Sequence, residues 1–263
     1  MPIQHLAIND ELLHAFSKEV RRLNIEMREW LDVSSDWDEV LANLRRADWR
    51  LRNQPADFGE NLPAKVYLAA GLSRLDGLFA NLGHEIRAIC RSILANGNAI
   101  LQRSESSLNS NLVRLIKESE TGGANNLLVI VRQEDLIEPC IELLRKELIS
   151  NVTVDTGYSA LQKKHQTDKL IVVGNSLDYS PSIFTSLSFR FGTTLVGYSW
   201  VPEQDSIETA LSLLANRRIA INVVHSISKN KSEAIDVSHF LEPSVEIASR
   251  QLKNRCKERV RPN

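Results

Sequence analysis

The chain has 263 residues, 43% of them hydrophobic and 25% charged, with a formal net charge of -1 at pH 7. This balance is typical of a globular protein, and it excludes attraction to nucleic acid through an overall positive charge. The three cysteines, Cys90, Cys140 and Cys256, lie far apart without paired spacing, which excludes a disulfide framework and a structural zinc site and predicts a reducing, cytoplasmic location.

The first residues do not form a basic leader followed by an apolar run, and no segment approaches the roughly 20 apolar residues of a membrane span. We therefore expect neither secretion nor a membrane partner. From Leu13 to Trp30, apolar residues recur at steps of three and four, which predicts an amphipathic helix. The sequence SSDWDEV from Ser34 onward predicts the start of a second helix, which ends near Pro55.

Four arginines surround Trp49 in this second helix. Arginines beside an indole can hold a phosphate backbone while the ring stacks on a base. A solvated helix face with its tryptophan turned into the core explains the same pattern and is the interpretation we favour. The arginines are Arg45, Arg46, Arg50 and Arg52.

The most regular apolar pattern follows, with alternating steps of four and three that predict a heptad seam along one long helix. Two interpretations stay open: a helix inside an intramolecular bundle, which the neighbouring amphipathic helices favour, and a coiled coil joining two protomers. Asn96-Gly97-Asn98 predicts an end or a kink, and a further helix through Leu108 and Ile116 would close the set. The seam consists of Leu68, Leu72, Leu75, Phe79, Leu82, Ile86, Ile89 and Ile93.

A glycine-containing polar stretch from Glu120 to Asn126 separates this helical part from a region of different pattern. We place the domain boundary there, with a helical bundle over residues 1–120 and an α/β domain over 125–263. Short apolar runs predict strands that alternate with helices, as in a mostly parallel, three-layer, Rossmann-like sheet. The expected strands are Leu127–Val131, Val152–Asp155, Leu170–Gly174, Thr194–Tyr198 and Ile219–Val224.

Three further helices are predicted in the α/β domain, over Glu134–Leu148, from Ser180-Pro181 onward, and from Asp205 to about Asn216. A terminal helix over Glu242–Val260 carries a cluster of basic residues. This cluster is a candidate nucleic-acid contact, although terminal helices are often rich in Lys and Arg without binding a ligand. Its members are Arg250, Lys253, Arg255, Lys257 and Arg259.

In an open parallel sheet, ligands bind beyond the carboxyl ends of the strands, where the direction of winding changes. The candidate residues for such a pocket are Arg132, Gly174, Asn175, Asp178, Trp200 and His225. The chain has no GxxxxGK phosphate loop, no GxGxxG after the first predicted strand, no GxSxG and no HExxH. We predict no catalytic residue, no cofactor and no metal site.

The order LLVIVRQEDLIEPCIELLRKEL, DKLIVVGN and TTLVGYSWVPEQ, over residues 125–202, resembles the second motor-type domain of helicases and their degenerate relatives. That family's phosphate loop, its acidic metal-binding box and an arginine-finger motif are not recognisable here. The resemblance implies a non-catalytic, helicase-like fold that works as an accessory subunit, for instance in a bacterial nucleic-acid or phage-defence system.

The sequence thus predicts a two-part interaction protein that binds a protein partner or a second copy of itself, and that contacts nucleic acid through a local patch. One alternative is a small-molecule enzyme or ligand sensor that uses the pocket at the carboxyl ends of the strands. Another is a purely structural subunit held together through the heptad seam.

Overall fold

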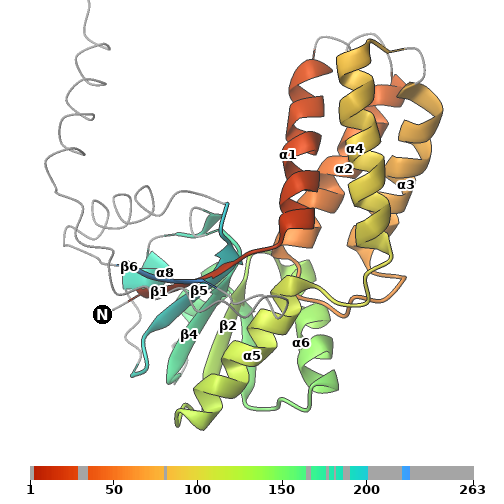
Figure 1. Cartoon of the computed structure of the whole chain (residues 1–263). Coiled ribbons are helices and arrows are strands. Elements are labelled where there is room, and N and C mark those ends of the chain that lie inside the picture. Colours follow the sequence, from red (N-terminus) through yellow and green to blue (C-terminus); the bar gives the residue numbers. More distant parts are fainter. Residues whose placement is uncertain are drawn as a thin grey trace, which may run out of the picture. The chain divides into compact units, whose positions relative to one another are not determined.

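The computed structural model describes residues 3–28, 35–79, 82–163, 167–175, 178–180, 182–185, 190–200 and 221–225. All of them belong to one compact unit, Met1–Ile227. One strand and a run of helices come first, and strands then alternate with helices (Figure 1). The elements are β1 (Ile3–Ile8), α1 (Glu11–Glu26), α2 (Ser35–Asn53), α3 (Pro63–Leu78), α4 (His84–Leu101), α5 (Ser107–Thr121), β2 (Leu127–Val131), η2 (Glu134–Leu136), α6 (Ile137–Lys146), β3 (Val152–Thr156), α7 (Gly157–Gln162), β4 (Lys169–Val173), α8 (Ser182–Thr185), β5 (Thr193–Tyr198) and β6 (Ile221–His225).

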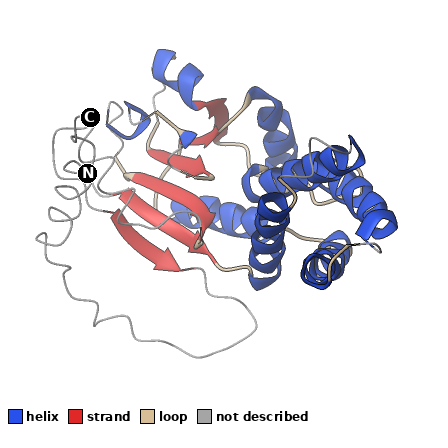
Figure 2. Ribbon diagram, turned by 90° about the horizontal axis from the view of Figure 1, so that it is seen from above, coloured by secondary structure: helices blue, strands red, loops and turns tan. Residues whose placement is uncertain are grey.

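The strands form one six-stranded sheet in the order β3-β2-β4-β5-β1-β6, and every neighbouring pair is parallel. Helices cover both faces, which confirms the predicted α/β, Rossmann-like class (Figure 2). Ile171 and Val173 face α5, α6 and the helical bundle, whereas Leu170 and Val172 face α7 and α8. Burial on both faces explains why these strands are continuous apolar runs without alternation.

The strand β1 was not predicted, because the sequence assigned the first residues to the helical part. It lies inside the sheet, where Ile3 pairs with Thr193 of β5 on one side and with Ile221 of β6 on the other. Its side chains alternate between the two cores, with Ile3 on one face and Leu6 and Ile8 on the other. The run IQHLAI is short, and nothing local in it indicates which strands it joins.

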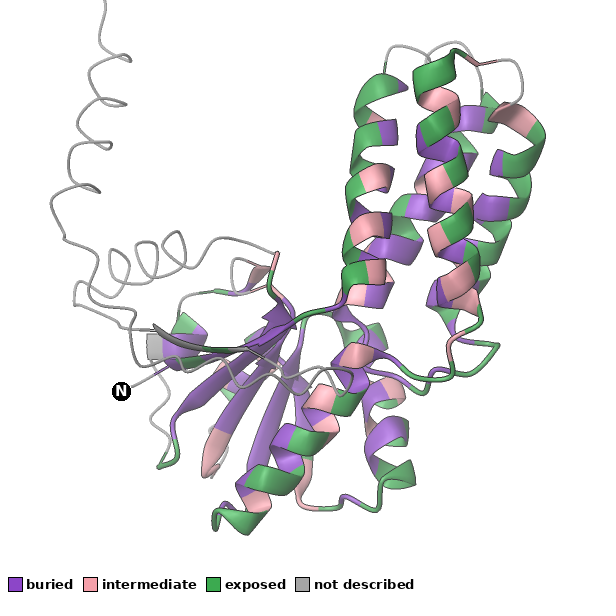
Figure 3. Cartoon of the chain, viewed as in Figure 1, coloured by how far each residue is buried: buried purple, intermediate pink, exposed green. Residues whose placement is uncertain are grey.

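Helices α1 to α4 form a four-helix bundle in which consecutive helices pack together and α1 also packs against α4. The predicted seam is not one helix, because α3 ends at Leu78 and α4 begins at His84. Five of its eight side chains, Leu68, Leu72, Leu75, Ile89 and Ile93, are buried in the chain's own core (Figure 3). The bundle therefore accounts for the burial of these five side chains without a second protomer.

The helix α4 does not end at Gly97, one of the two outcomes predicted, since it continues to Leu101. A Cβ at Gly97 would lie 2.7 Å from Leu72 Cδ1, and one at Gly71 would lie 2.9 Å from Leu44 Cδ2. The two glycines thus let neighbouring helices approach closely. The predicted fifth bundle helix, α5, instead packs on the sheet against β1 and β5.

The predicted helices over Asp205–Asn216 and Glu242–Val260 lie outside the described residues. The predicted helix over Glu134–Leu148 is present as η2 and α6 together. No described helix has both the length and the apolar character needed to cross a membrane.

Candidate functional site

The bundle is inserted at the carboxyl end of the sheet, where the chain leaves β1 at Asn9 and returns through residues 102–106 to α5 (Figure 1). This edge is where parallel sheets bind their ligands. Two clusters of side chains lie along it. One surrounds Asp10 at the ends of β1 and β5, and the other surrounds Arg132 at the ends of β2 and β4.

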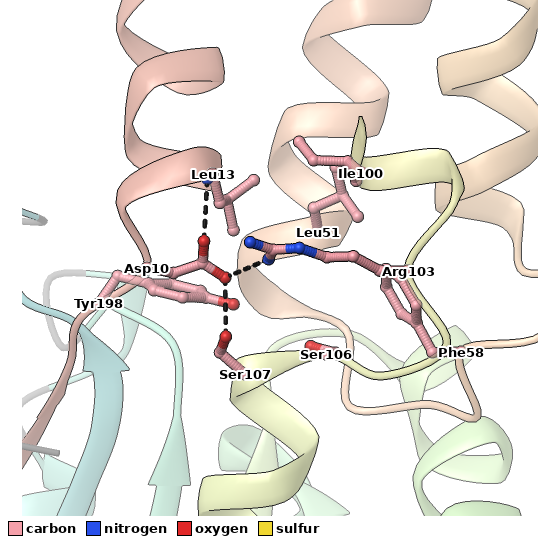
Figure 4. Close-up of a pocket in the computed structure, with 9 residues that line it drawn as sticks. All are labelled: Asp10, Leu13, Leu51, Phe58, Ile100, Arg103, Ser106, Ser107 and Tyr198. Atoms are coloured by element: carbon pink, nitrogen blue, oxygen red, sulfur yellow. Dashed lines mark hydrogen bonds and ion pairs between the residues drawn. The ribbon is translucent and has the colours of Figure 1, made fainter. Parts of the chain in front are cut away.

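Asp10 is the N-cap of α1, and its carboxylate joins the two points where the chain crosses between sheet and bundle (Figure 4). Oδ1 accepts a hydrogen bond from Leu13 N–H at 3.0 Å, while Oδ2 accepts from Ser107 Oγ at 2.7 Å. Arg103 Nη1 lies 2.6 Å from the same Oδ2. The Asp10 side chain is only 2% exposed, so its charge is compensated within the protein rather than by water.

Burial alone would raise the pKa of Asp10, but hydrogen bonds from Arg103, Leu13 N–H and Ser107 outweigh it and lower the pKa. The neighbouring Tyr198, at the end of β5, has a raised pKa because it is buried and because the Asp10 charge opposes a second negative charge. At neutral pH Asp10 is therefore ionised and Tyr198 is protonated. Neither group has a pKa matched to proton transfer near pH 7.

Lys65 strengthens the positive side of this cluster. It is 7% exposed, donates from Nζ to the backbone oxygen of Arg103 at 2.7 Å, and lies 4.6 Å from the centre of the Phe58 ring. A buried ammonium group on a carbonyl oxygen and an aromatic face is held in place by both contacts. It fixes the return of the chain from the bundle to the sheet.

The pocket beside Asp10 is small. Its cavity volume is about 10 Å³, close to the smallest space that holds one water molecule. Figure 4 shows Asp10, Arg103 and Ser107 directed toward one another at its centre. The pocket is lined by Asp10, Leu13, Leu51, Phe58, Ile100, Arg103, Ser106, Ser107 and Tyr198.

The second cluster lies where the direction of winding changes, between β2 and β4. Arg132 Nη1 is 2.6 Å from Asp178 Oδ2, and its guanidinium lies 5.8 Å from the centre of the Trp49 ring. Gly174 has a φ of +102°, and a Cβ there would lie 2.5 Å from Asn53 Oδ1. The end of α2 thus contacts the strand ends directly.

The structure brings four of the six predicted pocket residues together. Arg132 and Asp178 are paired, Gly174 lies at the end of β4, and Asn175 accepts a backbone hydrogen bond from Asp178 at 3.1 Å. Trp200 instead follows β5, the next strand beyond β4, and stacks on His14 with ring centres 4.8 Å apart. His225 ends β6, at one edge of the sheet.

The arginines around Trp49 are largely engaged within the protein. Arg50 lies 2.8 Å from Asp135, and Arg52 lies 2.7 Å from Asp48. Arg46 and Arg50 both lie within 6 Å of the centre of the Tyr67 ring. Trp49 itself is partly buried against the core, as the interpretation favoured from the sequence expects. The side chains of Arg50 and Arg52 are only 19% and 17% exposed, so they do not lie on the solvated face that the same interpretation expects.

The basic cluster from Arg250 to Arg259 lies outside the described residues. Within the residues that the structure places, no group of three or more His, Cys, Asp or Glu side chains is arranged to hold a metal ion. Comparison with protein family models, with curated proteins and with solved structures gives no match to this chain.

Sequence reasoning missed the Asp10 cluster. The available signal was Asp10 itself, a capping residue directly before an amphipathic helix. If Ile3–Ile8 had been recognised as a strand, Asp10 would have been placed at the carboxyl end of that strand, where parallel sheets bind ligands. Nothing local indicates Arg103 or Ser107, because they meet Asp10 across more than 90 residues of chain.

Proposed function

We propose that this protein is a non-catalytic accessory subunit that binds a protein partner. The observation that supports this most is the contact between the end of α2 and the strand ends of β2 and β4. Asn53 occupies the space beside Gly174, and Trp49 lies under Arg132. These bundle residues stand where a parallel sheet would otherwise receive a ligand.

The electrostatics support the same proposal. Arg132 is paired with Asp178, and Arg50 with Asp135, so a phosphate or carboxylate ligand would have to displace an existing partner from each arginine. At the other cluster, Arg103 is already bound to Asp10. Breaking a partly buried pair costs several times more than breaking an exposed one.

Capture from the native host, followed by reconstitution from purified components, tests the proposal. We expect one protein to bind the purified chain at a fixed stoichiometry. Gly174→Ala is the diagnostic variant, because it disturbs the strand-end contact while leaving the outer bundle surface unchanged. If the folded Gly174→Ala variant still binds the partner, the partner docks on the outer surface of the bundle. If it no longer binds, the partner contacts the strand ends.

The alternative is a small-molecule enzyme or sensor. A thermal-shift screen against nucleotides and metabolites separates it from the proposal, since a ligand at 100 times its dissociation constant adds about 2.7 kcal/mol. A ligand that stabilises the wild type but not Arg132→Met would contradict the accessory role. Titration of labelled single- and double-stranded nucleic acid over a salt series tests nucleic-acid contact, because phosphate contacts strengthen as salt falls.

A further inference from the structure

The strand β3 lies at the edge of the sheet and pairs only with β2 in the described part of the chain. The backbone oxygen of Asn151 accepts the N–H of Leu127 at 3.1 Å. Hydrogen-bonding residues alternate along a strand that pairs on one side, so Thr153 and Asp155 also face β2. The backbone N–H and C=O groups of Val152 and Val154 therefore point outward.

This edge carries one of the features that prevent pairing, the inward-facing charge of Asp155, but it lacks the others. Exposed edge strands commonly carry Lys, Pro, a bulge or a charge. The sequence VTVDT contains no Lys, Pro or Gly, and its register with β2 is continuous from Val152 to Thr156. Its single charge, Asp155, is 4% exposed and lies 3.0 Å from Lys163 Nζ. An edge of this kind is a template for another strand.

Two exposed apolar side chains flank the same edge. Leu148, four residues before β3, is 92% exposed, and Tyr158, two residues after it, is 75% exposed. Leu148 also has a φ of +59°, a conformation that costs a leucine roughly 1–2 kcal/mol. The positive φ belongs to the cap that ends α6, where Ile149 N–H donates to the backbone oxygen of Leu144 at 3.0 Å. The exposure of the two side chains is what points to a contact at this edge.

The charges at its two ends are complementary. Glu147 lies beside Leu148 at the amino end and is paired with Lys117, while Lys163 follows Tyr158 at the carboxyl end and is paired with Asp155. The side chains of Glu147 and Lys163 are exposed, so a charge from a second copy can approach each of them without breaking these pairs. An antiparallel partner brings each amino end beside a carboxyl end, so Glu147 approaches a lysine and Leu148 approaches a tyrosine. A parallel partner would place like ends, and like charges, together.

We propose that β3 pairs with β3 of a second copy of this chain, antiparallel and around a two-fold axis, so that the two sheets become one. Centred on Val154, the pairing joins Val154 to its equivalent through two N–H···O=C bonds. It also places Asp155 opposite Thr153 of the other copy, which avoids a meeting of like charges. The edge is thus complementary to itself, as a two-fold interface requires.

The pairing covers only five residues on each copy, so it buries less surface than a standard interface. We expect a dimer that forms and dissociates between about 1 µM and about 500 µM. This inference does not rest on the proposed binding of a different protein. Either one can fail without the other.

Sedimentation velocity of the full chain across this concentration range tests the pairing. Val154→Pro removes the central outward N–H, which an edge strand tolerates because its inner ladder is untouched. Val154→Ala is the matched control, since it loses packing but keeps the N–H. A double variant, Leu148→Gly with Tyr158→Ser, removes the flanking side chains, and Ile25→Ser changes an exposed apolar residue elsewhere on the chain.

We expect dimers from the wild type, Val154→Ala and Ile25→Ser, and monomers from Val154→Pro and from the double variant. If circular dichroism shows that Val154→Pro is unfolded, the double variant decides. A spin label at Thr153→Cys, in a Cys256→Ser background, should show strong dipolar broadening, because Thr153 lies diagonally across the two-fold axis from Thr153 of the other copy, about 7–8 Å away. A wild type that is monomeric throughout, or a dimer with sharp spectra at this label, would overturn the proposal.

Discussion

Arg103 Nη1 lies 2.6 Å from Asp10 Oδ2 and joins the point where the chain leaves the sheet to the point where it returns, 93 residues later. Asp10 is almost completely buried, whereas the Arg103 side chain is 32% exposed. The pair therefore holds the base of the bundle on the sheet while Arg103 keeps some contact with water. Its loss leaves a buried carboxylate with two remaining hydrogen bonds.

Arg103→Ala is expected to lower the free energy of unfolding by roughly 2–3 kcal/mol, because it removes the cation that compensates a buried charge. Arg114→Ala is the control. Arg114 and Glu118 form an exposed pair at 3.7 Å, and its loss should change stability by less than about 1 kcal/mol. Urea unfolding monitored by circular dichroism measures the free energy of unfolding of both variants. Equal losses would show that the buried Asp10–Arg103 pair stabilises the fold no more than an exposed pair does.

The pH dependence of the free energy of unfolding should show the protonation of the Asp10 carboxylate. Its folded pKa lies below the ordinary value of 3.8, so the unfolded chain binds the proton more readily. The stabilisation is complete above pH 3.8 and is lost as the pH falls through the lowered folded pKa. Asp10→Asn keeps an N-cap but has no charge, so the stability difference between wild type and variant should shrink in acid. A difference that stays constant from pH 7 to pH 3 would contradict the assignment.

Two helix glycines should respond in opposite directions to alanine. Gly97→Ala places a Cβ 2.7 Å and 2.8 Å from the two Cδ atoms of Leu72, and the resulting overpacking should cost roughly 1–3 kcal/mol. Gly77 has nothing within 4 Å of the corresponding position, so Gly77→Ala should stabilise by up to about 1 kcal/mol through helix propensity. Thermal unfolding of the two variants in parallel checks the signs.

Leu148→Gly should stabilise the monomer. Relief of the positive φ is worth roughly 1–2 kcal/mol, and the greater freedom of glycine in the unfolded chain removes about 0.4–1 kcal/mol of that gain. We expect a net increase near 0.5–1 kcal/mol, measured at low protein concentration where the chain is monomeric. Glu147→Gly, one residue earlier at a negative φ, should destabilise instead.

The buried thiols should be unreactive in the folded chain. Burial raises the pKa of Cys90 to about 11 and that of Cys140 to about 12, so almost no thiolate exists at pH 8. In a Cys256→Ser background, labelling with a thiol reagent should be slow in buffer and complete in denaturant. Rapid labelling under native conditions would mean that the core around these residues opens readily.

The sequence alone determined those helices and strands whose buried side chains leave a recognisable pattern of apolar residues. The runs LLVIV and KLIVV predict strands covered on both faces, and the steps of three and four before Trp30 predict α1, because periodicity records which side chains leave water. The same reasoning located Arg132, Gly174, Asn175 and Asp178 at strand ends. Six apolar side chains of α3 and α4, spaced as one seam, gave no sign of the break at residues 79–83.

Only the tertiary structure decided which elements meet. The place of β1 between β5 and β6, the packing of α5 on the sheet and the pairing of Asp10 with Arg103 depend on contacts between residues far apart in the chain. No local pattern encodes these contacts, because their free energy comes from burial and charge compensation that exist only after the chain has folded. That is why the candidate site at Asp10 became visible only in the structure.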